Sequence, residues 1–485
     1  MKYILFICFY TFGGLAATAQ DYNIVSYGAQ SRSNKLSTVA IQKAIDQASS
    51  AGGGRVIVPK GEFTSGSIFL KSGVELHLSK GATLLGSTNP ADYKKLGKWK
   101  GLILADTARG IVISGNGTID GRGAQIALYL DSLFHAGAID SIRYNLLEKR
   151  PMWYTRPQII YFVRCENIRV TGVTLQNSAC WVQTYEQCNR LRIDKIKVRS
   201  DAYWNNDGLD IVDSKNVRIT NCNINAADDG ICIKSEDWSH TYSCDSIYIE
   251  DCTVRSSASA VKFGTSSVND IKNVIIRNIR VYDTYRSAIA IEAMQGGVLE
   301  NILVENITAT NTGNALFLRI GQIRNAENPG VLRNVTLRNI KVTIPFERPD
   351  YKYEIRGPAL PEFHNIFPSS ITGIPGHPIQ NVTLENITII YPGRGNPAFA
   401  YLPTDRLNEV PELPTAYPEF SMFGELPAWG LYMRHVEGIT LKNIKMKIEN
   451  PDYRPAIVLD DVSNYTIEYL NIKGDAKANP IFEKK

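Results

Sequence analysis

The feature that most constrains the fold is a short strand-like segment that recurs along the chain. Each copy alternates apolar and polar residues, turns at an asparagine or a charged residue, and then resumes the alternation. The first five copies begin at Asn167, Arg190, Asn216, Ser246 and Asn273. Successive starts are 23 to 30 residues apart, which is too short for a strand followed by a crossover helix. The repeat therefore predicts a right-handed parallel β-helix, in which each coil buries its apolar row against the coils above and below.

Further copies begin at Ile302, Asn334, Asn381 and Gly438, so the pattern extends far along the chain. A length of 485 residues would ordinarily suggest two or three domains. The repeat overrides that expectation and indicates one all-β solenoid domain over residues 20–485. An asparagine recurs at the turn of the later copies, where it tolerates left-handed backbone geometry. These turn asparagines are Asn278, Asn306, Asn339, Asn386 and Asn443.

Residues 1–19 have the pattern of a signal peptide. Lys2 supplies a positive charge, Ile4–Leu15 an apolar core, and Ala17-Thr18-Ala19 a small-residue cleavage site. We therefore expect an exported protein, periplasmic or secreted. No later segment approaches the ~20 apolar residues that a membrane span needs. Of the eight cysteines, the seven after residue 19 are too dilute for a disulfide scaffold, and we expect Cys222 and Cys252 to be stacked, buried thiols.

The open end of a β-helix is a strand edge and an exposed core, so it needs a cover. Val39–Ala48 fits this role as a capping helix. Its apolar stripe at helical spacing consists of Val39, Ile41, Ala44, Ile45 and Ala48. Ser37 or Thr38 can cap the start of this helix, and three glycines at 52–54 end it.

Three segments interrupt the repeat, at about 125–152, 345–377 and 391–430. The first mixes tyrosine, leucine and charge, and we interpret it as a helical excursion. The other two are rich in proline, aromatic and charged residues, and we interpret them as long loops that leave the body of the β-helix. Loops of this length usually have a function. The sequence leaves the oligomeric state open.

Two short acidic clusters are candidates for chemistry. Asp207 lies in Asn205-Asn206-Asp207-Gly208-Leu209-Asp210, and the second cluster is Asp228-Asp229-Gly230. Asp207 and Asp228 are 21 positions apart, about one coil of the repeat, so the clusters should stack on one face. Carboxylates stacked that closely raise at least one pKa. One protonated carboxyl beside ionised ones is what acid/base hydrolysis of an acetal requires.

The same residues resemble the polygalacturonase family of pectin-degrading enzymes, glycoside hydrolase family 28, and the resemblance runs from about residue 22 to the end. The first cluster is similar to the family's NTDG[FI]D motif, and Asp228–Ile233 is similar to its DDC[IV]A[IV] motif. The resemblance implies inverting hydrolysis of a pectic glycoside. It makes Asp228 or Asp229 the general acid, and Asp207 with the remaining aspartate the base.

The chain departs from this family at two motifs that read the substrate. Where the family has GHGxSIGS, residues 258–265 read ASAVKFGT, so Ser259 replaces the histidine. Where the family has RIK, which grips a galacturonate carboxylate, the chain has Ala290-Ile291-Glu292. We therefore expect plain polygalacturonan to be a poor substrate. A rhamnose-containing substrate, or a galacturonate bound by other cations, is the alternative, and Glu292 suits a sugar hydroxyl.

Period-2 alternation indicates which neighbours face the substrate. In the strands at 231–235, 261–264 and 289–292 the isoleucines, Val261 and Phe263 point inward, so Lys234, Lys262 and Glu292 face outward. Arg286 is a third candidate cation. Trp204 could stack on a sugar ring, and Trp181 is an equally good packing residue. Together with Asn205 and Asp210 of the first motif, these residues and Ser259 form the expected substrate-binding set.

Other classes of function remain as alternatives. Asp-rich turns suit calcium, and a pectate-lyase-like enzyme of related fold would use it for β-elimination. A non-catalytic carbohydrate-binding β-helix would bind saccharide without turnover. The six histidines show no pair at ligand spacing, so we expect neither a metal site nor a cofactor. The net charge of +5 is not gathered in runs, which argues against nucleic acid as a partner.

The acid spacing and the insertions predict how the enzyme attacks its substrate. Inverting enzymes need ~6.5–9.5 Å between carboxyl groups to admit water, so the stacked clusters should be offset along the strand. If the insertions fold over the face that carries Asp207 and Asp228, they close a groove into a pocket. We therefore expect exo action that releases one or two sugars from the non-reducing end.

Overall fold

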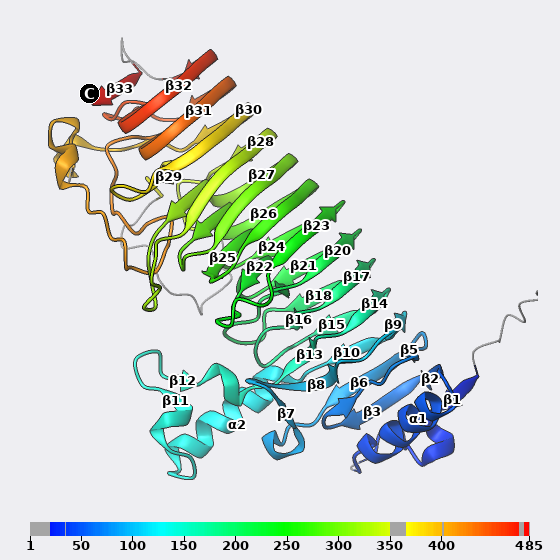
Figure 1. Ribbon diagram of the computed structural model, residues 1–485. Helices are drawn as coiled ribbons and strands as arrows, with labels where there is room; N and C mark the ends of the chain where they lie inside the picture. The colour runs from blue at the N-terminus through cyan, green and yellow to red at the C-terminus, as the bar shows by residue number, and fades with distance from the viewer. Residues whose placement is uncertain (1–19, 34, 350–364, 400–401, 475–479, 485) are drawn as a thin grey trace, which may run out of the picture.

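The computed structural model describes residues 20–33, 35–349, 365–399, 402–474 and 480–484, and within them the chain forms a right-handed parallel β-helix (Figure 1). The expected signal peptide at 1–19 lies outside the described residues. So do 350–364 and 400–401, which belong to two of the expected insertions. Across the described part of the chain, no helix is long and apolar enough to span a membrane.

Three stacks of parallel strands form the three sides of the β-helix. The first stack contains β1 (Asp21–Asn23), β2 (Gly54–Val58), β5 (Val74–Leu78), β9 (Val112–Gly115), β14 (Glu166–Thr171), β17 (Asn189–Asp194), β20 (Lys215–Thr220) and β23 (Cys244–Glu250). The second contains β3 (Gly61–Ser65), β6 (Ala82–Gly86), β10 (Thr118–Asp120), β15 (Thr174–Gln176), β18 (Lys197–Ser200), β21 (Asn223–Ala226) and β24 (Thr253–Ser256).

The third stack carries the candidate site. It contains β4 (Ile68–Phe69), β8 (Trp99–Asp106), β13 (Gln158–Val163), β16 (Gln183–Glu186), β19 (Leu209–Val212), β22 (Ile231–Ser235), β25 (Val261–Ser267) and β29 (Ser369–Thr372). Beyond these, long strands bend from one stack into another: β26 (Ile271–Ala293), β27 (Val298–Ile320), β28 (Val331–Thr343), β30 (Ile379–Tyr391), β31 (Leu431–Ile448) and β32 (Ile457–Lys473). Finally, β33 (Ile481–Lys484) pairs with the start of β32.

The alternating pattern explains both the core and the turns. Ile168, Leu191 and Val217 are register partners on β14, β17 and β20, and all three are buried in one continuous core. The five expected turn asparagines have left-handed φ angles of 52–57°. Their side chains also form a ladder, since the last four each donate to the asparagine one coil earlier, at 3.0 Å from Asn306 to Asn278, and Asn278 donates to Asp251. The prediction of left-handed turn geometry is confirmed.

The N-terminal end is covered by α1 (Thr38–Ser50), next to the 3-10 turn η1 (Ile24–Tyr27). Ile41, Ala44, Ile45 and Ala48 are buried as expected. The expected stripe is wrong at Val39, which is 67% exposed, because the buried face begins at Ala40. Ser37 is the cap residue by position, but its side chain makes no capping hydrogen bond.

The three expected insertions differ in structure. The first contains α2 (Gly123–His135), the turn η3 (Ser141–Arg143) and the antiparallel pair β11 (Tyr144–Asn145) and β12 (Arg150–Pro151). Within 345–377, β29 is a strand of the third stack. The described part of 391–430 contains η5 (Pro397–Phe399) and η6 (Thr404–Glu409). The remaining short elements are η2 (Pro90–Asp92), η4 (Trp153–Thr155) and β7 (Lys95–Leu96), which is antiparallel to β8.

The segment with α2, β11 and β12 and the loops after β30 project from the same side of the β-helix (Figure 1). This side is the outer face of the third stack. All seven cysteines of the described chain are buried free thiols, which confirms the prediction made for Cys222 and Cys252.

Candidate active site

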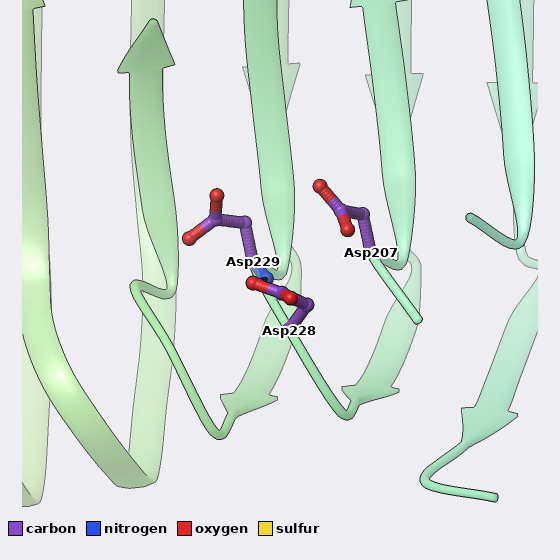
Figure 2. Close-up of side chains that lie close together, drawn as sticks. All are labelled: Asp207, Asp228 and Asp229. Atoms are coloured by element: carbon purple, nitrogen blue, oxygen red, sulfur yellow. Dashed lines mark hydrogen bonds between the residues drawn. The ribbon is translucent and has the colours of Figure 1, made fainter. Parts of the chain in front are cut away.

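Two turns that lead into the third stack bring the acidic clusters together. Asp207 precedes β19, and Asp228 and Asp229 precede β22, one coil later (Figure 2). The glycine after each cluster allows the coils to approach, because a Cβ on Gly208 would lie 2.6 Å from the carbonyl oxygen of Gly230. One carboxylate oxygen from each of Asp207, Asp228 and Asp229 lies within 4.8 Å of the others. The predicted stacking of the two clusters is therefore present in the structure.

Lys234 lies on the outer face of β22 and neutralises the first cluster. Its Nζ is 2.9 Å from Asp207 Oδ2 and 2.6 Å from Asp210 Oδ1. The same ammonium lies 3.5 Å from the centre of the Trp181 ring, which adds a cation–π contact. Lys234 and both carboxylates are buried. The ammonium is thus fully engaged by protein groups, although the strand pattern alone suggested a residue that contacts substrate.

Lys262 has the same role in the next coil. Its Nζ lies 3.5 Å from Asp229 Oδ2 and 3.4 Å from Glu292 Oε2. Asp229 also accepts a hydrogen bond of 3.1 Å from the backbone N–H of Ser259. Glu292 accepts one of 2.8 Å from the Thr265 hydroxyl. Ser259 therefore contacts Asp229 directly, and Glu292 is joined to Asp229 through Lys262.

Burial and mutual repulsion disfavour ionisation in this cluster. Burial, together with the charges of Asp210, Asp228 and Asp229, raises the pKa of Asp207 well above its usual range, while Lys234 opposes the shift. Burial raises the pKa of Asp210 to about 7 and that of Glu292 to about 7. Although burial works against the charged form of Lys234, the carboxylates of Asp207 and Asp210 hold its pKa well above the usual range.

A count of charges supports retained protons. The six acids Asp207, Asp210, Asp228, Asp229, Glu292 and Glu419 face three bases, Lys234, Lys262 and Arg286. Full ionisation would leave three uncompensated negative charges in a largely buried region, which is costly. The raised pKa values of Asp207, Asp210 and Glu292 agree with this count, and a group of acids of this kind can supply both a general acid and a general base.

These groups lie in a cleft of about 1580 Å³ on the outer face of the third stack. Its lining comes from the turns that carry Asp207, Asp228 and Asp229, from the outer side chains of β22 and β25, and from two segments that flank them. We call these flanking segments the N-terminal wall and the C-terminal wall. The expected substrate-binding residues Asn205, Trp204, Lys234, Lys262 and Arg286 line the cleft.

The N-terminal wall is aromatic and is held by arginines. Its cleft-lining residues are Trp99, Leu147, Glu148, Arg150, Trp153, Trp181 and Trp204. The rings of Trp153 and Trp181 lie 4.4 and 4.6 Å from that of Trp99. The guanidinium of Arg150 lies 4.3 Å from the Trp204 ring, and Arg150 also donates to Asn205 Oδ1 at 3.1 Å. Asn205 thus joins this wall to the turn that carries Asp207.

The C-terminal wall comes from the loop before β31. Tyr417, Glu419, Ser421 and Met422 line the cleft there. Glu419 Oε1 lies 2.6 Å from Arg286 Nη1, and both side chains are buried. Phe420 packs with Ala290, Phe317 and Phe367 on the outer face of the third stack. The loop is therefore fastened beside the acids by an ion pair and an apolar contact.

A bulge in β25 shapes the remaining edge of the cleft. Ile233 pairs with Phe263 but Ser235 pairs with Ser267, so β25 contains two extra residues at this point. Gly264 allows the bulge with φ of 87°, and Thr265 and Ser266 line the cleft. The Ser266 hydroxyl accepts a 3.0 Å hydrogen bond from Arg324, whose exposed guanidinium makes no ion pair with any described residue. Lys98, Glu236 and Trp238 complete this edge.

Three expected substrate-binding residues do not line the cleft. Asp210, Ser259 and Glu292 are buried behind Lys234, Asp229 and Lys262. Sequence reasoning missed Lys98, Arg150, Glu236, Arg324, Tyr417 and Glu419, because loops or distant coils carry most of them. Of these, only Glu236 carries a local signal, since it directly follows β22 on the strand that presents Lys234.

The three aspartates are the only group of acidic, histidine or cysteine side chains in the described chain that could share a metal ion. They fit a cation poorly, since two of them already contact the ammonium groups of Lys234 and Lys262. A calcium-dependent mechanism gains no support from this donor set.

Comparison with known proteins assigns the family. The family model for glycosyl hydrolases family 28 matches residues 49–344. The chain belongs to this family. As a member it is a glycosidase, which favours hydrolysis over the lyase and non-catalytic alternatives.

Curated relatives agree with this assignment, and solved structures agree with the fold. A probable polygalacturonase of Vitis vinifera is 23% identical over 414 residues, covering 78% of this chain and 76% of the relative. An exo-poly-alpha-D-galacturonosidase of Dickeya chrysanthemi is 27% identical, covering 44% of this chain and less than half, 42%, of that protein. In fold, the chain is similar to the family 28 exopolygalacturonase of Yersinia enterocolitica, with a TM-score of 0.69 at 18% identity, covering 93% of this chain and 79% of that one. A Thermotoga maritima exopolygalacturonase gives a TM-score of 0.61 at 23% identity, with coverage of 76% and 87%.

Proposed function

We propose that this family 28 protein is an exo-acting hydrolase of an α-linked pectic glycoside. The observation that carries the proposal is a cluster of three aspartates, two of them in contact with buried lysines, placed in a cleft between two walls. The decisive experiment is incubation of the purified protein with a panel of pectic oligosaccharides and analysis of the products. Absence of hydrolysis across homogalacturonan, rhamnogalacturonan and their oligomers would reject the proposal.

Asp228 is the proposed general acid. It is the least buried of the three aspartates and lines the cleft, where it can reach a glycosidic oxygen. It transfers its proton to that oxygen as the bond to the anomeric carbon breaks. Asp207 and Asp229 form the base, because the ammonium groups of Lys234 and Lys262 lie against their carboxylates and can compensate a negative charge there. They accept a proton from the water that attacks the anomeric carbon.

The stereochemical outcome proposed is inversion, as the family resemblance implies. One carboxylate oxygen from each aspartate lies within 4.8 Å of the others, so the three groups converge on one small volume. A water bound by Asp207 and Asp229 still fits, because two hydrogen bonds of ~2.7 Å can span that separation. Proton NMR of the first-formed anomer tests this step. Retention would mean that an aspartate attacks the sugar directly.

Exo action is supported by the two walls. Residues from the first insertion and from the loop before β31 line the same cleft as the acids, so a polymer lying across many coils would meet both. Released mono- or disaccharide should dominate the first few percent of digestion. A ladder of intermediate oligomers with a rapid fall in viscosity would instead indicate an open groove.

The substrate proposed carries a neutral sugar beside the acids and a uronate at the edge of the cleft. At the centre, acids outnumber bases and the lysines contact carboxylates, which disfavours another negative charge. At the edge, Arg324 is exposed and matches a carboxylate, with Trp238 nearby as a surface for a sugar ring. Faster hydrolysis of rhamnose-containing oligomers than of homogalacturonan is the expected result.

Export through residues 1–19 remains a proposal based on the sequence pattern. Sequencing the N-terminus of the protein recovered from the periplasm or medium tests it. A mature protein that begins near Gln20 is expected, and one that keeps residues 1–19 in the cytoplasm would contradict it.

A further inference from the structure

A basic groove lies on the outer face of the first stack, away from the cleft. It has a volume of about 420 Å³ and crosses β14, β17 and β20. Its polar lining consists of Arg169, Arg190, Arg192, Arg218, Asn167 and Asn216, and no acidic residue lines it. Figure 1 shows these strands on the opposite edge of the view from the loops that flank the cleft. The groove is therefore separate from the proposed catalytic machinery.

The charge pattern in this groove differs from that of the neighbouring row of outward side chains. Arg169 is the register partner of Arg192, and Arg192 is the partner of Arg218, so three like charges lie directly opposite one another. Such pairs destabilise a sheet. The neighbouring row alternates instead, as in Glu250, Arg277 and Glu305, where Arg277 and Glu250 approach to 2.7 Å.

The central arginines of the groove are available to a ligand. Arg169 and Arg192 are exposed, and neither forms an ion pair with a carboxylate in the described part of the chain. Arg190 and Arg218 have partial partners, at 2.9 Å from Glu166 and 3.4 Å from Glu250. Because neighbouring coils are ~4.8 Å apart, the row presents one guanidinium group per coil along the axis of the β-helix.

We propose that this arginine row is a second, non-catalytic binding site for an acidic polysaccharide. A polyuronate carries one carboxylate per sugar, so a chain that lies along the axis can present successive carboxylates to Arg169, Arg192 and Arg218. The choice of ligand rests on the proposed function. The acids of the cleft belong to the same coils, so a polymer held at the row keeps chain ends close to the cleft.

The test compares R169Q/R192Q with the control R280Q/K341Q, which removes two exposed charges from the second stack. Each pair is also made in the D228N background, so that the probe, long-chain polygalacturonate, is not degraded. We expect R169Q/R192Q to weaken binding at low salt by about fivefold, the scale for two exposed charge contacts. The control should bind polygalacturonate as the wild type does. Excess short oligosaccharide, which occupies the cleft, should not abolish polygalacturonate binding by the wild type.

Hydrolysis of short oligosaccharides separates this inference from the proposed function. R169Q/R192Q should keep the wild-type rate on short substrates and show a higher KM on polymer only. Equal weakening by both double variants would mean that only net charge matters, and no weakening would mean that the row does not bind; either result overturns the inference. Failure of the wild-type protein to hydrolyse any short oligomer would instead reject the proposed function.

Discussion

Lys234 gives the sharpest test of the charge balance in the site. The substitution Lys234→Met keeps the volume of the side chain and removes the ammonium that contacts Asp207 at 2.9 Å and Asp210 at 2.6 Å. Two buried carboxylates then lose their counter-ion. Removal of one partner from a buried ion pair typically costs about 3–5 kcal/mol. For a chain of 485 residues, an unfolding entropy of roughly 1 kcal/mol/K converts this loss to about 3–5 °C in Tm.

The loss should depend on pH with a definite sign. Burial raises the pKa of Asp207 and Asp210, so both carboxyls bind protons readily once Lys234 is absent. A protonated carboxyl needs no counter-ion. The Tm difference between Lys234→Met and wild type should therefore be small at pH 5 and large at pH 8. Turnover should also fall by about 100-fold, because the ionised form of Asp207 loses its support.

Differential scanning calorimetry of four proteins at both pH values tests this reasoning. Lys197→Met, which removes an exposed lysine from β18, controls for loss of a positive charge and should shift Tm very little. Lys234→Met/Asp210→Asn should recover some of the lost stability, because one uncompensated charge is removed with its partner. A Tm loss for Lys234→Met that equals that of Lys197→Met, or that is the same at pH 5 and pH 8, would refute the charge-sharing argument.

Four further outcomes are expected. Substitution of any one aspartate of the cluster by Asn (at Asp207, Asp228 or Asp229) should lower kcat at least 100-fold and leave Tm nearly unchanged. Substantial residual activity would exclude that residue from the reaction. Burial raises the pKa of Asp213 and Glu292 to about 7. Each protonated carboxyl therefore contributes its full stabilisation below pH ~4, and this contribution falls as the pH rises to ~7, by up to about 1.4 kcal/mol per pH unit. Glu292→Gln should flatten the measured Tm–pH curve. Gly208→Ala should cost about 1–3 kcal/mol in denaturant unfolding, because its Cβ would meet the Gly230 carbonyl oxygen at 2.6 Å. Glu419→Gln weakens the 2.6 Å contact with Arg286 that fastens the C-terminal wall. Chromatography should then detect more intermediate oligomers among the products of this variant. An unchanged product profile would argue against the wall as a barrier to the polymer.

The loop prediction shows where sequence patterns reach their limit. Proline and aromatic content identified 391–430 as a loop outside the repeat, but not where it packs. Glu419 meets Arg286, which lies 133 positions earlier, only because the chain passes through several coils and returns to the third stack. Similarly, Arg324 reaches the cleft through a hydrogen bond to Ser266, a residue exposed by a bulge that no periodicity in the sequence marks.

The sequence by itself determined the β-helix, the stacking of the two acidic clusters and the outward direction of Lys234 and Lys262. These follow from period-2 alternation and from a spacing of one coil, which are local properties of a chain whose coils contact their neighbours. Only the tertiary structure decided that both ammonium groups contact acids, that Ser259 and Glu292 lie behind them, and that two walls enclose the cleft. Those outcomes depend on side-chain distances between coils and on loops whose closure cost varies weakly with length, so sequence spacing carries little information about them.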